Sequence, residues 1–304
     1  MNASTIPIHR FREEHMTTTF EIQIVHEDET YARQAAQAAF QTTARLEKLL
    51  SRYRDDSEVS QLRHLAEGET LRLSVDTFSC LQLASEMQRM TGGAFDPGLG
   101  AEVDRARGKT LPGGEAAPSS RGQLALDAEN FTARCLCAPV NLDLGAIGKG
   151  FTVDRMTEDL REWDITRALI LASGSSILAM DGPGVGPDST WEITIAGWHR
   201  ILLRNGSIGC SGTAVKGAHI LDPRSGQAAQ GPCRTWAFAS SAAVSDALCT
   251  AWMLLGAGEI QEVCREAGGA RAIVQQEEEK PNQLTQITPE GIFIVQDNSQ
   301  IYAG

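Results

Sequence analysis

The sequence has 304 residues, of which 42% are apolar and 22% are charged. This composition is typical of a globular protein and too apolar for a disordered chain. Asp and Glu total 39 against 27 Lys and Arg, which gives a formal net charge of -12. An acidic surface repels phosphate backbones, and the basic residues form no local patch, so no nucleic-acid partner is expected.

The cysteine pattern and the hydropathy exclude two further classes. The seven cysteines are an odd number and include no C-x-x-C pair, so we expect small buried thiols in a reducing compartment. No apolar run reaches the length of a signal peptide or a membrane helix, so no membrane span is expected. The protein is therefore expected to be cytoplasmic as written, or periplasmic if its true start lies upstream.

The N-terminal third is predicted to open with a strand and continue mainly as helices. Residues 16–25 are β-branched and alternate in polarity, which indicates a strand. Residues 30–54 have apolar positions three and four apart, which indicates an amphipathic helix. Another helix is expected over 75–90, stopped by two glycines. A short helix is expected over 57–64, where Ser57 can act as the cap, and a brief strand over 71–73.

The remaining elements alternate irregularly between strands and helices. Strands are expected over residues 124–141 (a pair), 168–171, 192–196, 201–203, 234–239, 271–274 and 292–295. Helices are expected over residues 150–163, 242–255 and 260–267. The strand at 271–274 is expected to pair with that at 292–295 as a hairpin.

This order favours an α+β fold with mixed sheets and packed helices over a doubly wound parallel sheet. Residues 1–304 are expected to form one domain. Within it, residues 1–15 are expected to be disordered, and residues 104–123, rich in Gly, Pro, Ser and charge, are expected to form a long surface loop.

Two glycine-containing segments in the first half of the chain could bind a ligand. Residues 91–100 (TGGAFDPGLG) combine a flexible backbone with Asp96, although a helix stop followed by a turn also explains them. Residues 141–150 (NLDLGAIGKG) end in a lysine at the start of a helix. They fail the P-loop pattern, because Asp143 replaces its first glycine and Gly150 its hydroxyl residue. Asp143, Lys149 and the first helical amides could still hold an anion, with a structural loop as an equal alternative.

Two later segments contain candidate side chains for proton transfer and for metal binding. Residues 217–226 (GAHILDPRSG) contain His219 within what is otherwise an ordinary turn sequence. In residues 240–250 (SSAAVSDALCT), Asp246 and Thr250 are four apart and therefore lie on one face of a helix. Their oxygen donors suit a hard cation such as Mg2+. The spacing alone also allows Ser245 or Asp246 simply to cap that helix.

The order of these segments resembles the motif order of the ApbE-like FAD:protein FMN transferases. RYRDDSEVSQL, TGGAFDP, LDLGAIGKGFTVD, GAHILDPRSG and SDALCTA occur in that family's order, and the resemblance extends from residue 16 to about residue 256. MTTTF resembles the family's Met-Gly-Thr-Thr start, with Thr17 replacing the glycine. The resemblance implies a T-fold-like architecture with an FAD cleft between two halves.

The resemblance also implies a reaction and a set of site residues. The family transfers the FMN half of FAD to a Thr or Ser hydroxyl of an acceptor flavoprotein, in a reaction that requires Mg2+ and releases AMP. The acceptor carries a segment of the type Asp-x-x-Ser/Thr-Gly-Ala-Thr. By this resemblance His219 is a candidate catalytic base. The implied FAD-binding residues are Met16, Tyr53, Ala94, Phe95, Asp96, Asp143, Lys149, His219 and Ile220. The implied metal ligands are the main-chain oxygen of Ala146 together with Asp246 and Thr250.

The sequence departs from the family pattern at two places. LASGSSI has Ser173, and Ser175 or Ser176, where the family has a Gly-Gly-Asp/Asn turn. CSGTAVKGAHI lacks the Tyr-Glu-Arg-type residues that usually precede the histidine. Two alternative functions therefore stay open, a metal-dependent FAD diphosphatase and a non-catalytic FAD-binding protein. DPRSGQA at residues 222–228 begins like the acceptor segment and then diverges, so the protein is not expected to modify itself.

Overall fold

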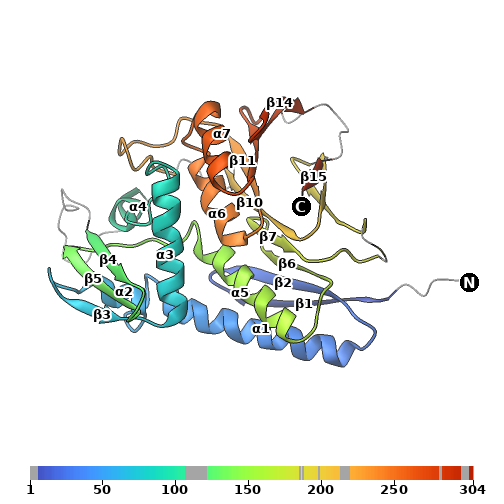
Figure 1. The fold of residues 1–304 in the computed structure, drawn as a ribbon, viewed down its shortest axis with the longest axis horizontal. Coiled ribbons are helices and arrows are strands. Elements are labelled where there is room, and N and C mark those ends of the chain that lie inside the picture. Colours follow the sequence, from blue (N-terminus) through green and yellow to red (C-terminus); the bar gives the residue numbers. More distant parts are fainter. Residues whose placement is uncertain are drawn as a thin grey trace, which may run out of the picture.

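A large antiparallel sheet organises the molecule (Figure 1). The computed structural model describes residues 6–106, 122–184, 186, 188–197, 199–212, 220–280, 283–295 and 301–303. The large sheet has nine strands in the order β1-β2-β6-β7-β10-β11-β12-β13-β14. Its strands are β1 (Ile8–His15), β2 (Thr18–Val25), β6 (Ala168–Ala172), β7 (Ser176–Ala179), β10 (Gly206–Gly212), β11 (Arg234–Ala239), β12 (Arg271–Gln275), β13 (Leu284–Thr288) and β14 (Gly291–Val295).

Two smaller sheets lie beside the large one. One has the order β15-β9-β8, and its strand β15 runs parallel to β9. The other has the order β3-β5-β4 and is antiparallel. Their strands are β3 (Thr70–Arg72), β4 (Gln123–Asp127), β5 (Thr132–Cys137), β8 (Trp191–Ile195), β9 (His199–Leu203) and β15 (Ile301–Ala303).

The predicted helices form, and polar side chains cap several of them. The helices are α1 (Glu29–Leu50), α2 (Glu58–Arg63), α3 (Val75–Met90), α4 (Gly100–Ala106), α5 (Gly148–Glu162), α6 (Ala242–Ala251) and α7 (Ala257–Glu266). Asp28, Ser57, Ser74 and Ser241 each precede a helix and accept a hydrogen bond from an amide of its first turn. Such caps satisfy amides that have no partner within the helix. The expected capping role of Ser57 is confirmed.

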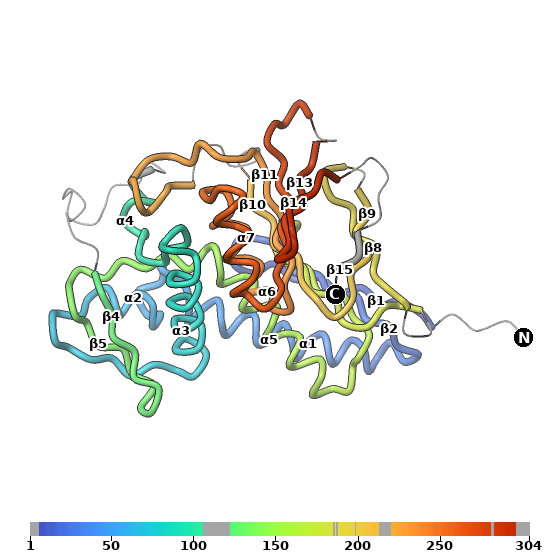
Figure 2. Tube along the Cα trace, turned by 45° about the horizontal axis from the view of Figure 1, so that its top comes forward, coloured from blue at the N-terminus to red at the C-terminus, as the bar shows by residue number. Residues whose placement is uncertain are grey.

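The large sheet separates two of the three apolar cores. Helices α1 and α5 cover one face and bury Phe20, Ile22 and Met156 there. On the other face, the sheet with β8 and β9 packs against Trp236 and its neighbours. The third core lies between α3, α6 and α7 and extends to the small sheet β3-β5-β4, which lies at the end of the molecule away from β1 (Figure 2). An α+β fold with mixed sheets, as predicted from the order of elements, is therefore present.

Several predictions about individual segments are wrong. Residues 8–15, within the stretch expected to be disordered, form β1, because they pair with β2 along their whole length. The expected hairpin of 271–274 with 292–295 does not form, because β13 lies between β12 and β14. The expected loop 104–123 is shorter at both ends, since α4 continues to Ala106 and β4 begins at Gln123. Residues 107–121 of that loop lie outside the described residues.

All seven cysteines are unpaired, and the expectation that they are buried holds for four of them. Cys80, Cys135, Cys249 and Cys264 are buried. Burial raises the pKa of the Cys80 thiol to about 12, because the thiolate would lose its hydration. In the described part of the chain, no helix is long and apolar enough to cross a membrane.

The turn between β1 and β2 places two side chains in a left-handed backbone conformation. Met16 and Thr17 have φ of 50° and 59° and form a two-residue hairpin loop, because His15 pairs directly with Thr18. Such loops favour Asn and Gly, whereas a β-branched residue at positive φ is strained.

Replacing Thr17 with glycine is therefore expected to raise the free energy of unfolding by about 0.5–1 kcal/mol, because strain relief exceeds the entropy cost of glycine. Urea denaturation measures the change. Thr18→Gly, one residue on in β2 at ordinary φ, is the control and should be destabilising. A loss of stability in Thr17→Gly as large as in Thr18→Gly would contradict the strain argument.

Candidate functional site

The side chains of Lys149 and Asp246 meet where the first turn of α5 packs against α6. Their Nζ and Oδ2 atoms are 3.6 Å apart, although the residues are far apart in the sequence. The side chain of Asp246 is 4% exposed and that of Lys149 is 22% exposed, so the amine can reach solvent while the carboxylate is buried. The Lys149 ammonium also donates to the Gly145 carbonyl at 3.0 Å. An ammonium group that can reach solvent and a buried carboxylate are thus in contact at this point of the protein.

Close packing holds Asp246 in place from two sides. The amide of Gly150 donates to Asp246 Oδ2 at 3.1 Å. A Cβ atom at Gly150 would lie 2.1 Å from the Ala242 carbonyl oxygen, so only glycine lets α5 approach α6 this closely. On the other side, a Cβ atom at Gly209 of β10 would lie 2.1 Å from the Ser245 carbonyl oxygen. Helix α6, which carries Asp246, is therefore packed closely between α5 and strand β10 of the large sheet.

Asp246 does not cap α6. Ser241 is the N-cap, and its hydroxyl accepts the Val244 amide. Asp246 lies in the middle of α6, where an aspartate has no helix terminus to stabilise. The Ser245 hydroxyl accepts from the Ser207 hydroxyl and donates to the Ala242 carbonyl instead. The capping alternative is thus wrong, and burying this carboxylate calls for a cationic partner.

The oxygen atoms around Asp246 fit a hard cation. Thr250 lies one turn further along α6, and its hydroxyl donates to the Asp246 carbonyl at 3.3 Å, which leaves its lone pairs available. Within the described part of the chain, no donor hydrogen-bonds to the Ala146 carbonyl, because the Gly150 amide turns to Asp246 instead. Also among the described residues, no cluster of three or more His, Cys, Asp and Glu could hold a metal. A cation here would therefore need main-chain and hydroxyl oxygens in addition to Asp246.

The nearby thiols do not compete for such a cation. Burial, reinforced by the Asp246 carboxylate, raises the pKa of Cys249 well above its usual value, and its Sγ lies 3.1 Å from the Asp246 carbonyl oxygen. Burial raises the pKa of Cys210 to about 11, against the opposing effect of Arg234. Both remain thiols at neutral pH, so the donors are oxygen atoms, as Mg2+ prefers.

Asp143 is bound to other protein groups rather than left open. Its Oδ2 accepts from Arg52 Nη1 at 2.7 Å, and its Oδ1 accepts from the Gly145 amide at 2.8 Å. The Arg52 guanidinium is buried and also donates to the Gly100 carbonyl and to Asp104. Both carboxylate oxygens of Asp143 thus shape the loop that leads into α5.

The two glycine-containing segments of the first half lie side by side. The Asp143 amide donates to the Pro97 carbonyl at 2.7 Å, and the Gly100 amide donates to the Asn141 carbonyl at 2.9 Å. A Cβ atom at Gly100 would lie 2.7 Å from the same Asn141 oxygen. The segments 91–100 and 141–150 therefore form one unit. Arg52 binds both of them, since it donates to the Gly100 carbonyl and to Asp143.

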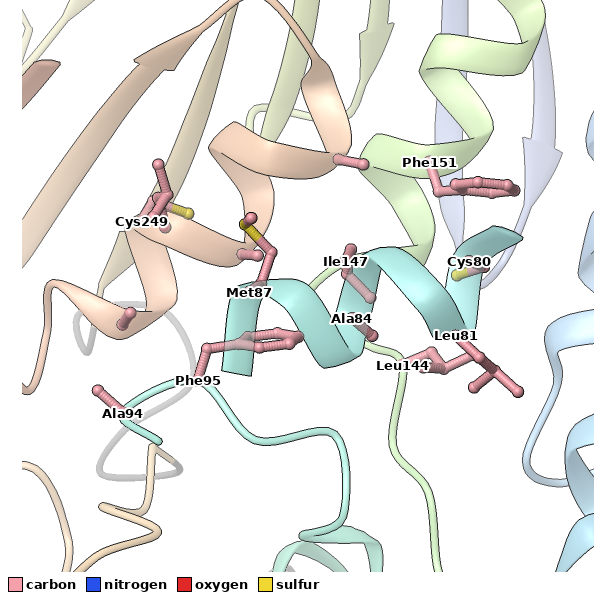
Figure 3. Packing of buried hydrophobic residues seen from close by; sticks show 14 of the residues in the cluster. Cys80, Leu81, Ala84, Met87, Ala94, Phe95, Leu144, Ile147, Phe151 and Cys249 are labelled. Carbon is pink, nitrogen blue, oxygen red and sulfur yellow. The ribbon is translucent and has the colours of Figure 1, made fainter. Parts of the chain in front are cut away.

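The remaining expected site residues occupy different surroundings. Ala94 and Phe95 are buried, and the Phe95 ring lies beneath α3 near Met87 (Figure 3). Asp96 is half-buried, and its Oδ1 accepts from the Gly98 amide at 2.7 Å. The binding roles expected for these three residues stay predictions.

Met16 contacts helices α1 and α5, whereas Tyr53 lies against its sequence neighbour Arg52. The Met16 amide donates to Glu47 of α1 at 2.7 Å, and the Met16 Sδ is 3.8 Å from the Thr152 hydroxyl of α5. Tyr53 is 58% exposed, and the guanidinium of Arg52 lies 5.3 Å from its ring centroid. Met16 therefore lies beside the helix that carries Lys149, and Tyr53 is linked to Asp143 only through Arg52.

The histidine segment is described only in part. His219 lies outside the described residues, so its roles as base and as FAD contact stay predictions. Ile220 is 7% exposed, and its carbonyl accepts from the Ala229 amide at 2.8 Å. Among the described residues, no hydrogen bond joins Ile220 to Lys149 or Asp246.

Sequence reasoning missed Arg52 and Glu47, which hold site elements in place. Arg52 directly precedes Tyr53 in a recognised motif, and Glu47 lies in the last turn of a well-predicted helix. Their types and spacing are ordinary for solvent-facing helix residues. Only the folded arrangement shows that one is buried and that the other accepts the amide of a strained turn.

Arg52→Met is expected to lower the free energy of unfolding by about 3–5 kcal/mol, because it leaves the half-buried carboxylates of Asp104 and Asp143 without their cation. Arg54→Met is the matched control, since Arg54 and its partner Asp56 are exposed and such pairs contribute at most about 1 kcal/mol. Chemical denaturation compares the two. Equal effects would mean that Arg52 does not tie these segments together.

The fold and this arrangement define a class of known protein. Among solved structures, the apo form of the flavinyl transferase ApbE from Pseudomonas stutzeri superposes with a TM-score of 0.77, at 23% identity, covering 95% of this chain and 97% of that chain. The ApbE protein of Thermotoga maritima superposes with a TM-score of 0.74, at 21% identity, covering 96% and 97%. The chain therefore has the fold of the ApbE flavin transferases.

The sequence supports the same assignment independently of the fold. The model of the ApbE family matches residues 16–274, and the chain belongs to this family. An FAD:protein FMN transferase of Klebsiella pneumoniae (strain 342) is 29% identical over 211 residues, which are 63% of this chain and 66% of that protein. An FAD:protein FMN transferase of Treponema pallidum (strain Nichols) is 26% identical over 280 residues, covering 79% and 76%. The family resemblance found in the sequence is confirmed.

Proposed function

We propose that this protein transfers the FMN moiety of FAD to a Thr or Ser hydroxyl of an acceptor flavoprotein and releases AMP, with Mg2+ as the required cation. The observation that carries the proposal is the contact of Lys149 with Asp246, at an Nζ to Oδ2 distance of 3.6 Å. The names of the relatives and the family membership support the same reaction. The acceptor would carry an Asp-x-x-Ser/Thr-Gly-Ala-Thr-like segment.

The proposed reaction breaks the phosphoanhydride bond of FAD and forms a phosphate ester with the acceptor hydroxyl. The acceptor oxygen attacks the phosphorus of the FMN half, the bond from that phosphorus to the bridging oxygen breaks, and AMP leaves with the electron pair. The acceptor proton passes to a base, for which His219 is the candidate. Lys149 would bind the diphosphate from the solvent-facing side of its contact with Asp246. Transfer of this kind depends mainly on positioning and on neutralising phosphate charge.

The residues that would hold Mg2+ are Asp246, Thr250 and the Ala146 carbonyl. The support is their chemistry: one buried carboxylate, one hydroxyl, and one carbonyl without its usual helical partner. Mg2+ bound there would neutralise the negative charge of the diphosphate. An otherwise acidic protein supplies little positive charge of its own for this purpose. Lys149 alone adds a single positive charge, so a second cation is the expected complement.

An intact-mass assay tests the proposal. The purified protein is incubated with FAD, Mg2+ and a peptide that bears the acceptor segment, and the expected product is the peptide with one FMN attached. Conversion of FAD to FMN and AMP with an unmodified peptide would support an FAD diphosphatase instead. FAD that stays intact on the protein for hours in Mg2+ would support a non-catalytic FAD-binding protein.

Lys149→Ala is expected to weaken FAD binding by about tenfold or more, because it removes a charge-assisted contact with the diphosphate. Titration calorimetry with FAD in EDTA measures this effect without the metal and without turnover. Lys48→Ala is the control, since Lys48 is an exposed residue in the last turn of α1. An unchanged dissociation constant in Lys149→Ala would remove Lys149 from the binding site.

A further inference from the structure

We propose that Asp154 is the positioning residue of this site, because it locks α6 onto α5 and so sets where the Asp246 carboxylate lies relative to the Lys149 amine. The importance of that distance for catalysis rests on the proposed function. The positioning itself does not, since the contacts of Asp154 with α6 require neither FAD nor metal. Asp154 belongs to the LDLGAIGKGFTVD segment, in which neither its type nor its spacing indicates a role.

Asp154 caps the first turn of α6 together with Ser241, which binds the Val244 amide. Its Oδ1 accepts from the Ala242 amide at 2.7 Å. Its Oδ2 accepts from the Ala243 amide at 2.9 Å and from the Ser241 hydroxyl at 2.7 Å. Two of the amides that α6 cannot satisfy internally are therefore bound by a side chain of the neighbouring helix. The positive end of the α6 dipole also favours a carboxylate at this point.

These contacts fix the position of α6 relative to α5 along the helix axes. Asp154 lies four residues after Gly150 on α5, and Asp246 lies four residues after Ala242 on α6, so each pair faces the other helix one turn apart. Gly150 contacts Asp246, and Asp154 contacts Ala242, which makes two rungs between the helices. A slip along the helix axes would break both rungs together and separate the Lys149 amine from its carboxylate.

The carboxylate is needed because it accepts three hydrogen bonds with two oxygens. Burial raises the pKa of Asp154, while the amides of Ala243 and Ala242 and the Ser241 hydroxyl oppose that rise. Asparagine keeps one accepting oxygen and turns an NH2 group toward a donor, so it cannot reproduce the cap. Asp154→Asn therefore removes the lock while nearly conserving the volume of the side chain.

Hydrogen exchange of the Gly150 amide tests the proposal on the protein without FAD or metal. This amide donates to Asp246, so its protection reports the contact between α5 and α6 directly. In Asp154→Asn we expect the Gly150 amide to exchange at least about tenfold faster relative to the Ile170 amide of the interior strand β6. Using this ratio removes the effect of any general loss of stability. Unchanged relative protection would overturn the proposal.

A matched variant separates positioning from ordinary helix capping. Glu58 accepts from the Ser74 amide and hydroxyl and so caps α3, which carries neither Lys149 nor Asp246. Glu58→Gln is expected to leave the relative protection of Gly150 unchanged, and an equal loss there would also overturn the proposal. If Asp154→Asn does not fold, Ser241→Ala removes one of the three donors, and it should shift Gly150 exchange in the same direction.

A second readout connects the lock to the cation. Titration of the FAD complex with Mn2+, followed by electron paramagnetic resonance, should show at least about tenfold weaker binding in Asp154→Asn, in line with other residues that orient metal ligands. Wild-type affinity in this variant would show that Asp154 does not position Asp246 for a cation. Failure of the wild-type protein to modify an acceptor would count against the proposed function and leave the exchange result standing.

Discussion

Replacing Asp246 with asparagine is expected to lower the rate of FMN transfer about 10²–10³-fold, the range found when a group that stabilises charge in the transition state is removed. Asparagine nearly conserves the volume and can still accept the Gly150 amide, so the fold should persist. The loss would come from the negative charge that balances Lys149 and would hold Mg2+. Intact-mass kinetics with an acceptor peptide measure the rate, and Mn2+ titration measures the cation separately.

Asp159→Asn is the control for this change, because Asp159 lies on α5 beyond the first turn, away from the Lys149 contact. It should transfer FMN at close to the wild-type rate. Undiminished transfer by Asp246→Asn, with unchanged Mn2+ affinity, would mean that the cation is held elsewhere in the protein.

Gly150→Ala is expected to disrupt the packing of α5 on α6 strongly. The added Cβ would lie 2.1 Å from the Ala242 carbonyl oxygen, a main-chain atom that cannot rotate away. Helices α5 and α6 must then separate, which should cost about 1–3 kcal/mol of the free energy of unfolding. Because the Gly150 amide also leaves Asp246, transfer activity should fall by at least about 10²-fold, as expected when a reacting geometry shifts by an ångström.

Gly148→Ala gives a matched control two residues earlier in the same helical turn. Its Cβ would lie 3.8 Å from the Leu144 side chain, an ordinary contact distance, and alanine favours helix more than glycine does. This variant should be as stable as the wild type or more stable. Denaturation and activity measured side by side decide the point, and equal behaviour of the two alanine variants would refute the close-approach argument.

Local sequence patterns were sufficient to predict most helices and to place Asp246 and Thr250 on one face of a helix. The helix predicted over residues 75–90 has the bounds of α3, because helix formation and a glycine stop both depend on local sequence. Helical periodicity places Asp246 and Thr250 on one face of α6. The order of the motifs was sufficient to identify the family, since each motif keeps its local composition.

Elements whose formation depends on distant partners were predicted less well. Strand β10 (Gly206–Gly212) contains small residues without β-branched alternation and forms because β7 and β11 pair with it on either side. Strand β1 was expected to be disordered, and β2 orders it. Sheet pairing is a long-range interaction, so a short window of sequence carries little information about it.

The sequence by itself determined the helical periodicity, the family and the residue types that a diphosphate and a hard cation would need. Only the tertiary structure decided that Lys149 and Asp246 meet, that both carboxylate oxygens of Asp143 are bound by Arg52 and Gly145, and that Asp154 caps the helix which carries Asp246. The physical reason is that these features depend on the approach of two helices, which a glycine permits. Contacts between residues nearly a hundred positions apart follow from packing, which no local pattern encodes.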